Sequence, residues 1–153
     1  MTQKTRILFV DDEQLVLSAL RRTLPHDELE CWFTQEAEAA MGIVAEYGID
    51  VVVTDHHMPT MTGVELLSMM RRLQPHVGRV LITGQADLQM SIQAVNEGAV
   101  HRILEKPWDE RTIVRMLRGA HMEARQSSAG RTKARETGSA AEMTAVEGGR
   151  AKA

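Results

Sequence analysis

The chain has little cysteine and few aromatic residues, and each shortage excludes a class of function. Cys31 is the single cysteine among 153 residues, which excludes an internal disulfide and a cysteine-based metal site and fits a reducing compartment. Aromatic residues make up 3% of the sequence, too few for a platform on which nucleic-acid bases could stack. The core must be built from Leu, Val, Ile, Ala and 10 Met.

Long apolar runs and glycine-rich nucleotide motifs are also missing. No run of about 18 uninterrupted apolar residues occurs, and the N-terminus turns acidic before a signal-length apolar segment is complete. We therefore expect a cytoplasmic protein with no membrane partner. Neither G-x-G-x-x-G nor P-loop spacing occurs, which excludes a nucleotide site of either kind.

The charge of the chain differs between its body and its last residues. Residues 1–124 carry 12 Lys+Arg and 18 Asp+Glu, a net charge of -6, whereas residues 125–153 carry 6 and 3, a net charge of +3. This last segment is mostly Ala, Gly, Ser, Thr and charged residues, so it has little apolar surface to bury. We predict one domain over 1–124 and a flexible basic tail over 125–153. The tail fits a solvated linker better than a nucleic-acid surface.

Short apolar runs alternate with amphipathic patterns along residues 1–124. The runs predict five strands, at 6–10, 30–33, 50–54, 79–83 and 101–104. The amphipathic patterns predict five helices, at 15–24, from Ala37 to a stop at Gly48, at 64–73, from an N-cap at Asp87 to a stop at Gly98, and at 113–124. Strands that alternate with helices favour a parallel sheet covered on both faces. The predicted fold is a doubly wound α/β domain with the flavodoxin-like strand order 2-1-3-4-5.

Polar residues follow the predicted strands at their carboxyl ends, where such sheets carry their sites. Asp11 and Asp12 follow the first strand, Asp55 the third, Thr83 ends the fourth, and Lys106 follows the fifth. Three clustered carboxylates repel one another unless a hard cation is present, and their oxygen atoms suit Mg²⁺ or Mn²⁺. The carboxylates, ammonium and hydroxyl together form a set that can bind a phosphoryl group. We select Asp55 as the nucleophile, because a carboxylate can form an aspartyl phosphate.

At this point the sequence resembles a known family, the response-regulator receiver domain of bacterial two-component signalling. The resemblance covers about residues 5–124 and rests on motifs in the family's order, ILFVDDE, VVVTDHHMPTMTGVELL, VLITGQAD and LEKPW. The ending K-P-W-D is similar to that of one subgroup of receivers.

The resemblance implies a role for each of these residues. Asp55 would accept a phosphoryl group from a kinase histidine, Asp12 would bind Mg²⁺ directly, and Asp11 would bind it mainly through water. The backbone carbonyl of His57 would be the third protein ligand. Lys106 would contact the phosphoryl group. Thr83 would supply the switch hydroxyl that moves toward the phosphoryl group. The peptide bond before Pro107 would be cis.

Some positions depart from the family's usual pattern or tune its chemistry. Ile103 stands three residues before Lys106, where the family commonly has Tyr or Phe, so the usual coupled rotation of an aromatic ring cannot operate here. His57 and Gln85, two residues after Asp55 and Thr83, hold positions that the family uses to tune hydrolysis of the acyl phosphate. The adjacent histidines at 56 and 57 fit no zinc motif.

The predicted function is therefore a phosphorylation-controlled switch and not an enzyme that turns over a separate substrate. Phosphorylation would change the surface of the fourth helix, fifth strand and fifth helix, which would form a homodimer or bind a separate effector protein. A sensor histidine kinase or a phosphotransfer protein would be the upstream partner. The surface residues in question are Met90, Gln93, Asn96, His101, Arg111, Arg115 and Arg118.

Two other functions stay open on the sequence alone. A phosphohydrolase would use Asp55 or Asp11 as nucleophile, but the D-x-D signature and a cap segment of the haloacid-dehalogenase type are absent. The chain could also be an interaction module that works without phosphorylation, or bind nucleic acid through its basic tail. Steep salt dependence that disappears on deletion of 125–153 would distinguish the last of these.

Overall fold

The computed structural model describes residues 3–136 and contains one five-stranded sheet. Its strands are β1 (Thr5–Val10), β2 (Leu29–Thr34), β3 (Val51–Asp55), β4 (Gly78–Thr83) and β5 (Arg102–Glu105). Its helices are α1 (Gln14–Thr23), α2 (Ala37–Tyr47), α3 (Gly63–Leu73), α4 (Leu88–Asn96) and α5 (Glu110–Glu136), with a short 3-10 turn, η1 (Gln85–Asp87), before α4. None of these helices is both long and apolar enough to cross a membrane.

The sheet is parallel throughout and has the order β2-β1-β3-β4-β5, which confirms the predicted fold. All five strands match predicted runs, and their ends differ from the predicted ones by one residue at most. Two helix ends are also set as predicted, because Gly48 and Gly98 have positive φ angles of 63° and 86° at the ends of α2 and α4.

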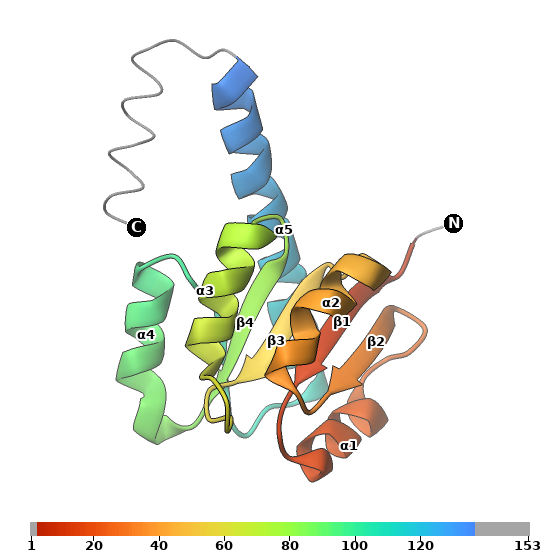
Figure 1. Cartoon of the computed structure of the whole chain (residues 1–153). Helices are drawn as coiled ribbons and strands as arrows, with labels where there is room; N and C mark the ends of the chain where they lie inside the picture. Colours follow the sequence, from red (N-terminus) through yellow and green to blue (C-terminus); the bar gives the residue numbers. More distant parts are fainter. Residues whose placement is uncertain (1–2, 137–153) are drawn as a thin grey trace.

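Helices cover both faces of the sheet, so the core has two halves. In β1, Ile7 and Phe9 pack with buried residues of α1 and α5, whereas Leu8 and Val10 pack with those of α2, α3 and α4. Figure 1 shows α2 and α3 on one side of the sheet and α5 along the other. β3 is buried over its whole length, Val51–Asp55, because it lies in the middle of the sheet. Asp55 is therefore held at the end of a fully buried central strand.

The last helix is longer than predicted. Its buried positions, Ile113, Leu117, Ala120 and Ala124, match the predicted stripe, but the helix continues to Glu136, twelve residues past Ala124 (136 minus 124). Figure 1 shows this part of α5 extending beyond the end of the sheet. The first part of the predicted tail is therefore helical in backbone. The remainder of that tail, 137–153, lies outside the described residues.

Candidate functional site

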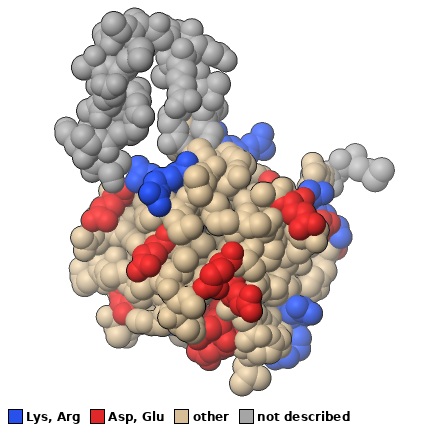
Figure 2. All heavy atoms as spheres, viewed as in Figure 1, with Lys and Arg blue, Asp and Glu red and all other residues tan. Residues whose placement is uncertain are grey.

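The parallel sheet brings the ends of its strands to one edge. Asp55 is the last residue of β3 and pairs in register with Ile82 of β4, and Thr83, the last residue of β4, pairs with Glu105 of β5. Asp11 and Asp12 follow β1 directly. Figure 2 shows acidic side chains scattered over the face in view, including its lower part, the end at which the strands of Figure 1 finish. Residues up to 95 positions apart (106 minus 11) thus meet at one site.

Three carboxylates form a compact cluster at this edge. One oxygen each of Asp11, Asp12 and Asp55 lies within 4.8 Å of the others. Asp11 and Asp55 are buried, and Asp12 is partly exposed, so the cluster opens to solvent on one side. Such a set of hard oxygen ligands with room for water suits a magnesium ion.

Asp11 has one satisfied and one unsatisfied carboxylate oxygen among the described residues. Its Oδ1 accepts a hydrogen bond of 2.9 Å from the backbone N–H of Glu13. Its Oδ2 is buried and accepts no hydrogen bond from any described residue. Burial, with the negative charge of Asp55 nearby, raises the pKa of Asp11 to about 6. A buried carboxylate oxygen without a partner fits the donor set of a divalent-ion site.

The ammonium of Lys106 lies beside this cluster. Its Nζ is 3.4 Å from Oδ1 of Asp55, and the Lys106 side chain is 38% exposed whereas that of Asp55 is 9% exposed. The backbone N–H of Lys106 donates to the carbonyl of Thr83 at 3.0 Å, which fixes the chain after β5 against the end of β4. The peptide bond between Lys106 and Pro107 is cis. An anionic group bound at the carboxylate of Asp55 would therefore contact the ammonium of Lys106, which lies on the solvent-exposed side of the cluster.

The residues predicted to carry the switch lie on β4, on β5 and on the turn η1 that follows β4. Thr83 is buried, and its hydroxyl donates to the carbonyl of Gly84 at 3.0 Å. Ile103 lies on β5 opposite Leu81 and is partly buried. Gln85 is exposed at the start of η1. The hydroxyl of Thr83 thus bonds its own loop in this structure.

The loop between β3 and α3 contains a contact that sequence reasoning missed. His57 Nε2 lies 2.7 Å from Oδ2 of Asp87, the residue that ends η1. Asp87 occupies the predicted N-cap position of α4, but its side chain makes no capping hydrogen bond. Asp11 and Asp12 do not cap α1 either, because its N-cap is Glu13. Local sequence carries no signal for the contact between His57 and Asp87, since 30 positions separate the two residues.

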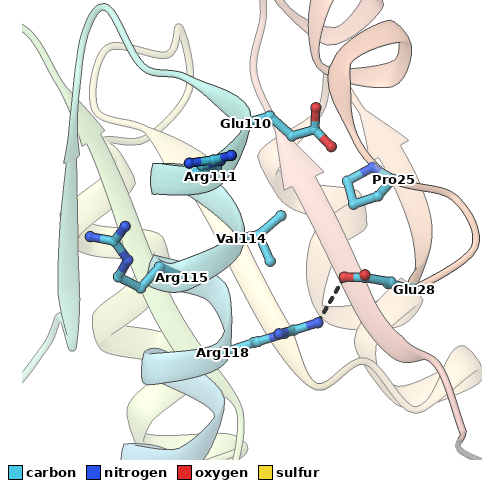
Figure 3. Close-up of a pocket in the computed structure, with 7 residues that line it drawn as sticks. All are labelled: Pro25, Glu28, Glu110, Arg111, Val114, Arg115 and Arg118. Atoms are coloured by element: carbon cyan, nitrogen blue, oxygen red, sulfur yellow. Dashed lines mark hydrogen bonds and ion pairs between the residues drawn. The ribbon is translucent and has the colours of Figure 1, made fainter.

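Several residues of the predicted output surface are bonded within the domain, among them Gln93, whose Nε2 donates to Oε1 of Glu97 at 2.9 Å. Arg118 of α5 donates to Oε2 of Glu28 at 2.7 Å, and Figure 3 shows this arginine reaching across a groove of about 450 Å³ between α5 and the segment before β2. His101 Nδ1 accepts the backbone N–H of Arg79 at 3.0 Å. Arg111 and Arg115 line the same groove as Arg118. Part of the predicted surface is therefore already used to hold the fold.

Comparison with known proteins gives the family. The model of the response regulator receiver domain matches residues 7–118. The chain belongs to the response regulator receiver domain family. Receiver domains of this kind act in two-component signalling, and the acidic site at the strand ends lies within the matched residues.

The relatives include regulators from several bacteria. The chain is 34% identical over 120 residues to the transcriptional regulatory protein FixJ of Rhizobium meliloti, covering 78% of this chain and 58% of that protein. It is 32% identical over 118 residues to the hydrogenase transcriptional regulatory protein HoxA of Cupriavidus necator, covering 77% of this chain and 24% of that protein. It therefore spans only part of the length of these relatives.

A solved structure agrees with the sequence match. The signal receiver domain of an HD-domain-containing protein from Pseudomonas fluorescens Pf-5 superposes with a TM-score of 0.74 at 31% identity, covering 84% of this chain and 95% of that one. The receiver thus corresponds to nearly all of that separately solved domain.

Replacing Asp11 by asparagine is expected to stabilise the metal-free receiver by about 1–2 kcal/mol at neutral pH. The pKa of Asp11 is raised from 3.8 to about 6, so the folded state keeps this proton to a higher pH than the unfolded chain does. The contribution of Asp11 to the free energy of unfolding therefore falls as the pH rises from 3.8 to about 6. Asparagine does not ionise, so the variant does not lose stability in this way. Urea unfolding at neutral pH and at about pH 5 measures the free energy of unfolding of both proteins. The difference between Asp11→Asn and the wild type should be smaller at the lower pH.

Magnesium provides the second half of this experiment. Mg²⁺ should raise the free energy of unfolding of the wild type and raise that of Asp11→Asn much less, because one ligand is lost. A wild type that Mg²⁺ does not stabilise would contradict the metal site.

Proposed function

We propose that Asp55 is the phosphoacceptor of this receiver and that it takes a phosphoryl group from a histidine kinase or a phosphotransfer protein. The observation that supports this most directly is the ammonium of Lys106, 3.4 Å from Oδ1 of Asp55, beside a cluster of three carboxylates. In the transfer, an oxygen of Asp55 forms a bond to phosphorus while the bond between phosphorus and the donor nitrogen breaks. Lys106 neutralises negative charge on the transferred oxygens.

A divalent cation completes the proposed site. Asp12 and Asp55 would bind Mg²⁺ or Mn²⁺ directly, Asp11 mainly through water, and the backbone carbonyl of His57 would supply the remaining protein ligand. When bound, the ion offsets the charge of the carboxylates and orients the phosphoryl oxygens. The buried Oδ2 of Asp11, which has no hydrogen-bond partner among residues 3–136, supports this assignment.

The output of the phosphorylated receiver would be a binding event. We propose that Thr83 turns toward the phosphoryl group and that the surface of α4, β5 and α5 changes with it, promoting a homodimer or the binding of an effector protein. Because Ile103 replaces the usual aromatic residue, this change would be transmitted by backbone and aliphatic packing. Tuning of hydrolysis is assigned to His57 and Gln85. We also propose that phosphoryl transfer takes place in the cytoplasm. We assign the chain to the K-P-W-D subgroup of receiver domains.

A direct test is to incubate the wild type with acetyl phosphate and Mg²⁺ and measure the mass of the intact protein. One phosphoryl group per chain is expected, removed by hydroxylamine, as an acyl phosphate is. EDTA should prevent its uptake. Absence of the adduct, or an adduct that resists hydroxylamine, would contradict the proposal. Sustained release of phosphate from many phosphomonoesters would instead support a phosphohydrolase.

Lys106→Ala is expected to lower the rate of phosphorylation by about tenfold to 100-fold, because the positive charge next to the transferred group is lost. Stopped samples analysed by mass at successive times give this rate. Lys4→Ala is the matched control, since Lys4 is an exposed lysine whose ammonium bonds only the carbonyl of His26 among described residues. Equal loss in both variants would show that general charge, and not contact with Asp55, is responsible.

A further inference from the structure

The pair His57 and Asp87 joins the two loops that flank Asp55. His57 lies on the loop after β3, two residues past Asp55, and Asp87 lies on the turn after β4, four residues past Thr83. The distance between His57 Nε2 and Asp87 Oδ2 is 2.7 Å, that of a well-formed hydrogen bond. The bond therefore closes a bridge between these loops at the carboxyl edge of the sheet.

Asp87 makes this bond in place of the one its position favours. At an N-cap, an aspartate usually accepts a backbone N–H of the first helical turn. In α4 the Asp87 carboxylate makes no such bond, although the Asp87 backbone carbonyl accepts the hydroxyl of Ser91 at 2.9 Å. The side chain of Asp87 is 28% exposed and that of His57 is 71% exposed. Because the imidazole of His57 is mostly exposed, surrounding side chains restrain it little, and its hydrogen bond to Asp87 is its main restraint.

A second contact orients the imidazole of His57. The rings of His56 and His57 meet edge to face, with centroids 4.8 Å apart and planes at 72°. His56 follows Asp55 directly, and its ring is partly buried. The imidazole of His57 is thus held by a ring on its own loop and by a carboxylate on the other loop.

We propose that Asp87 is a positioning residue which, through His57, sets the lifetime of the acyl phosphate, an inference that rests on the proposed phosphoacceptor function. The acyl phosphate is lost when a water oxygen bonds to phosphorus, the bond from phosphorus to the Asp55 oxygen breaks, and the water proton passes to solvent. A bridge between the loops restricts the approach of that water. Without it, the loops separate more readily and hydrolysis becomes faster.

The test is a double-mutant cycle on the decay of the phosphorylated receiver. Asp87→Ala and His57→Ala should each shorten the lifetime by about fivefold, the effect of roughly one lost hydrogen bond. The double variant should also lose about fivefold, because both substitutions break the same bond. Asp87→Asn keeps an acceptor oxygen and should retain most of the wild-type lifetime. Glu97→Ala removes an exposed carboxylate at the other end of α4 together with the hydrogen bond that it accepts from Gln93 Nε2 at 2.9 Å, a contact away from both loops, and should decay like the wild type.

The possible results separate this inference from the function on which it rests. Single variants that decay like the wild type, or effects that multiply in the double variant, would overturn the bridge. A wild type that takes up no phosphoryl group would instead overturn the phosphoacceptor proposal. The unphosphorylated protein offers a separate check. The ¹⁵N resonance of His57 Nε2 should shift in Asp87→Ala and stay in place in Glu97→Ala, and an unchanged resonance in Asp87→Ala would contradict the bond.

Discussion

Asp55→Asn is expected to take up no phosphoryl group from acetyl phosphate, while keeping the fold of the wild type. An amide of the same shape has no carboxylate nucleophile, so the aspartyl phosphate cannot form. Asp55 is buried at the end of the central strand, and among the described residues its carboxylate is the one that pairs with the ammonium of Lys106. Intact-protein mass after incubation with Mg²⁺ measures the uptake. The effect should be complete, and it is the largest that we expect at this site.

Asp109→Asn is the matched control for that experiment. Asp109 is an exposed carboxylate three residues after Lys106, and its Oδ1 accepts the backbone N–H of Thr112 at 2.8 Å. Asparagine can accept the same hydrogen bond, so α5 should remain intact. Full uptake in Asp109→Asn with none in Asp55→Asn would assign the reaction to Asp55. Equal uptake in both variants would contradict the assignment.

The sheet could be predicted from sequence because its signals are local and repeated. Runs such as 51–54 contain only β-branched residues, which favours a buried strand, and each run is followed by a helical pattern. Once the strands are parallel, their carboxyl ends share an edge, and the positions of Asp11, Asp55 and Lys106 follow from topology alone. The predicted cluster of carboxylates is therefore a consequence of strand order. The alternation of strands and helices along the sequence indicates that order.

Contacts between loops could not be predicted in this way. His57 and Asp87 meet because two irregular segments have particular shapes. Arg118 of α5 likewise meets Glu28 of the segment before β2 across 90 positions. The end of α5 was missed for another reason. The residues after Ala124 can bury little apolar area, which argues against an ordered segment, but Ala, Arg, Glu and Lys have high helix propensity. A helix that is already formed can be extended by such residues without tertiary packing.

Gly63→Ala is expected to lower the free energy of unfolding by about 3 kcal/mol and to disturb the site itself. Gly63 begins α3 and is buried where this helix meets the end of β3, and its N–H donates to the carbonyl of His56 at 2.9 Å. A Cβ atom there would overlap the backbone oxygen of Asp55 and lie 2.9 Å from Cδ1 of Leu81. Backbone cannot move aside as a flexible side chain can, so either α3 or Asp55 must shift.

Gly42→Ala separates this steric effect from the general effect of adding a methyl group to a helix. Gly42 lies inside α2, and a Cβ atom there would have nothing within 4 Å. Alanine should therefore stabilise α2 by up to about 1 kcal/mol, the usual difference in helix propensity. Urea unfolding of both variants gives the two free energies, and acetyl phosphate uptake should be slowed in Gly63→Ala alone. Similar stability of the two variants would contradict the close approach of α3 to the backbone of Asp55, which helps to fix that residue at the edge of the sheet.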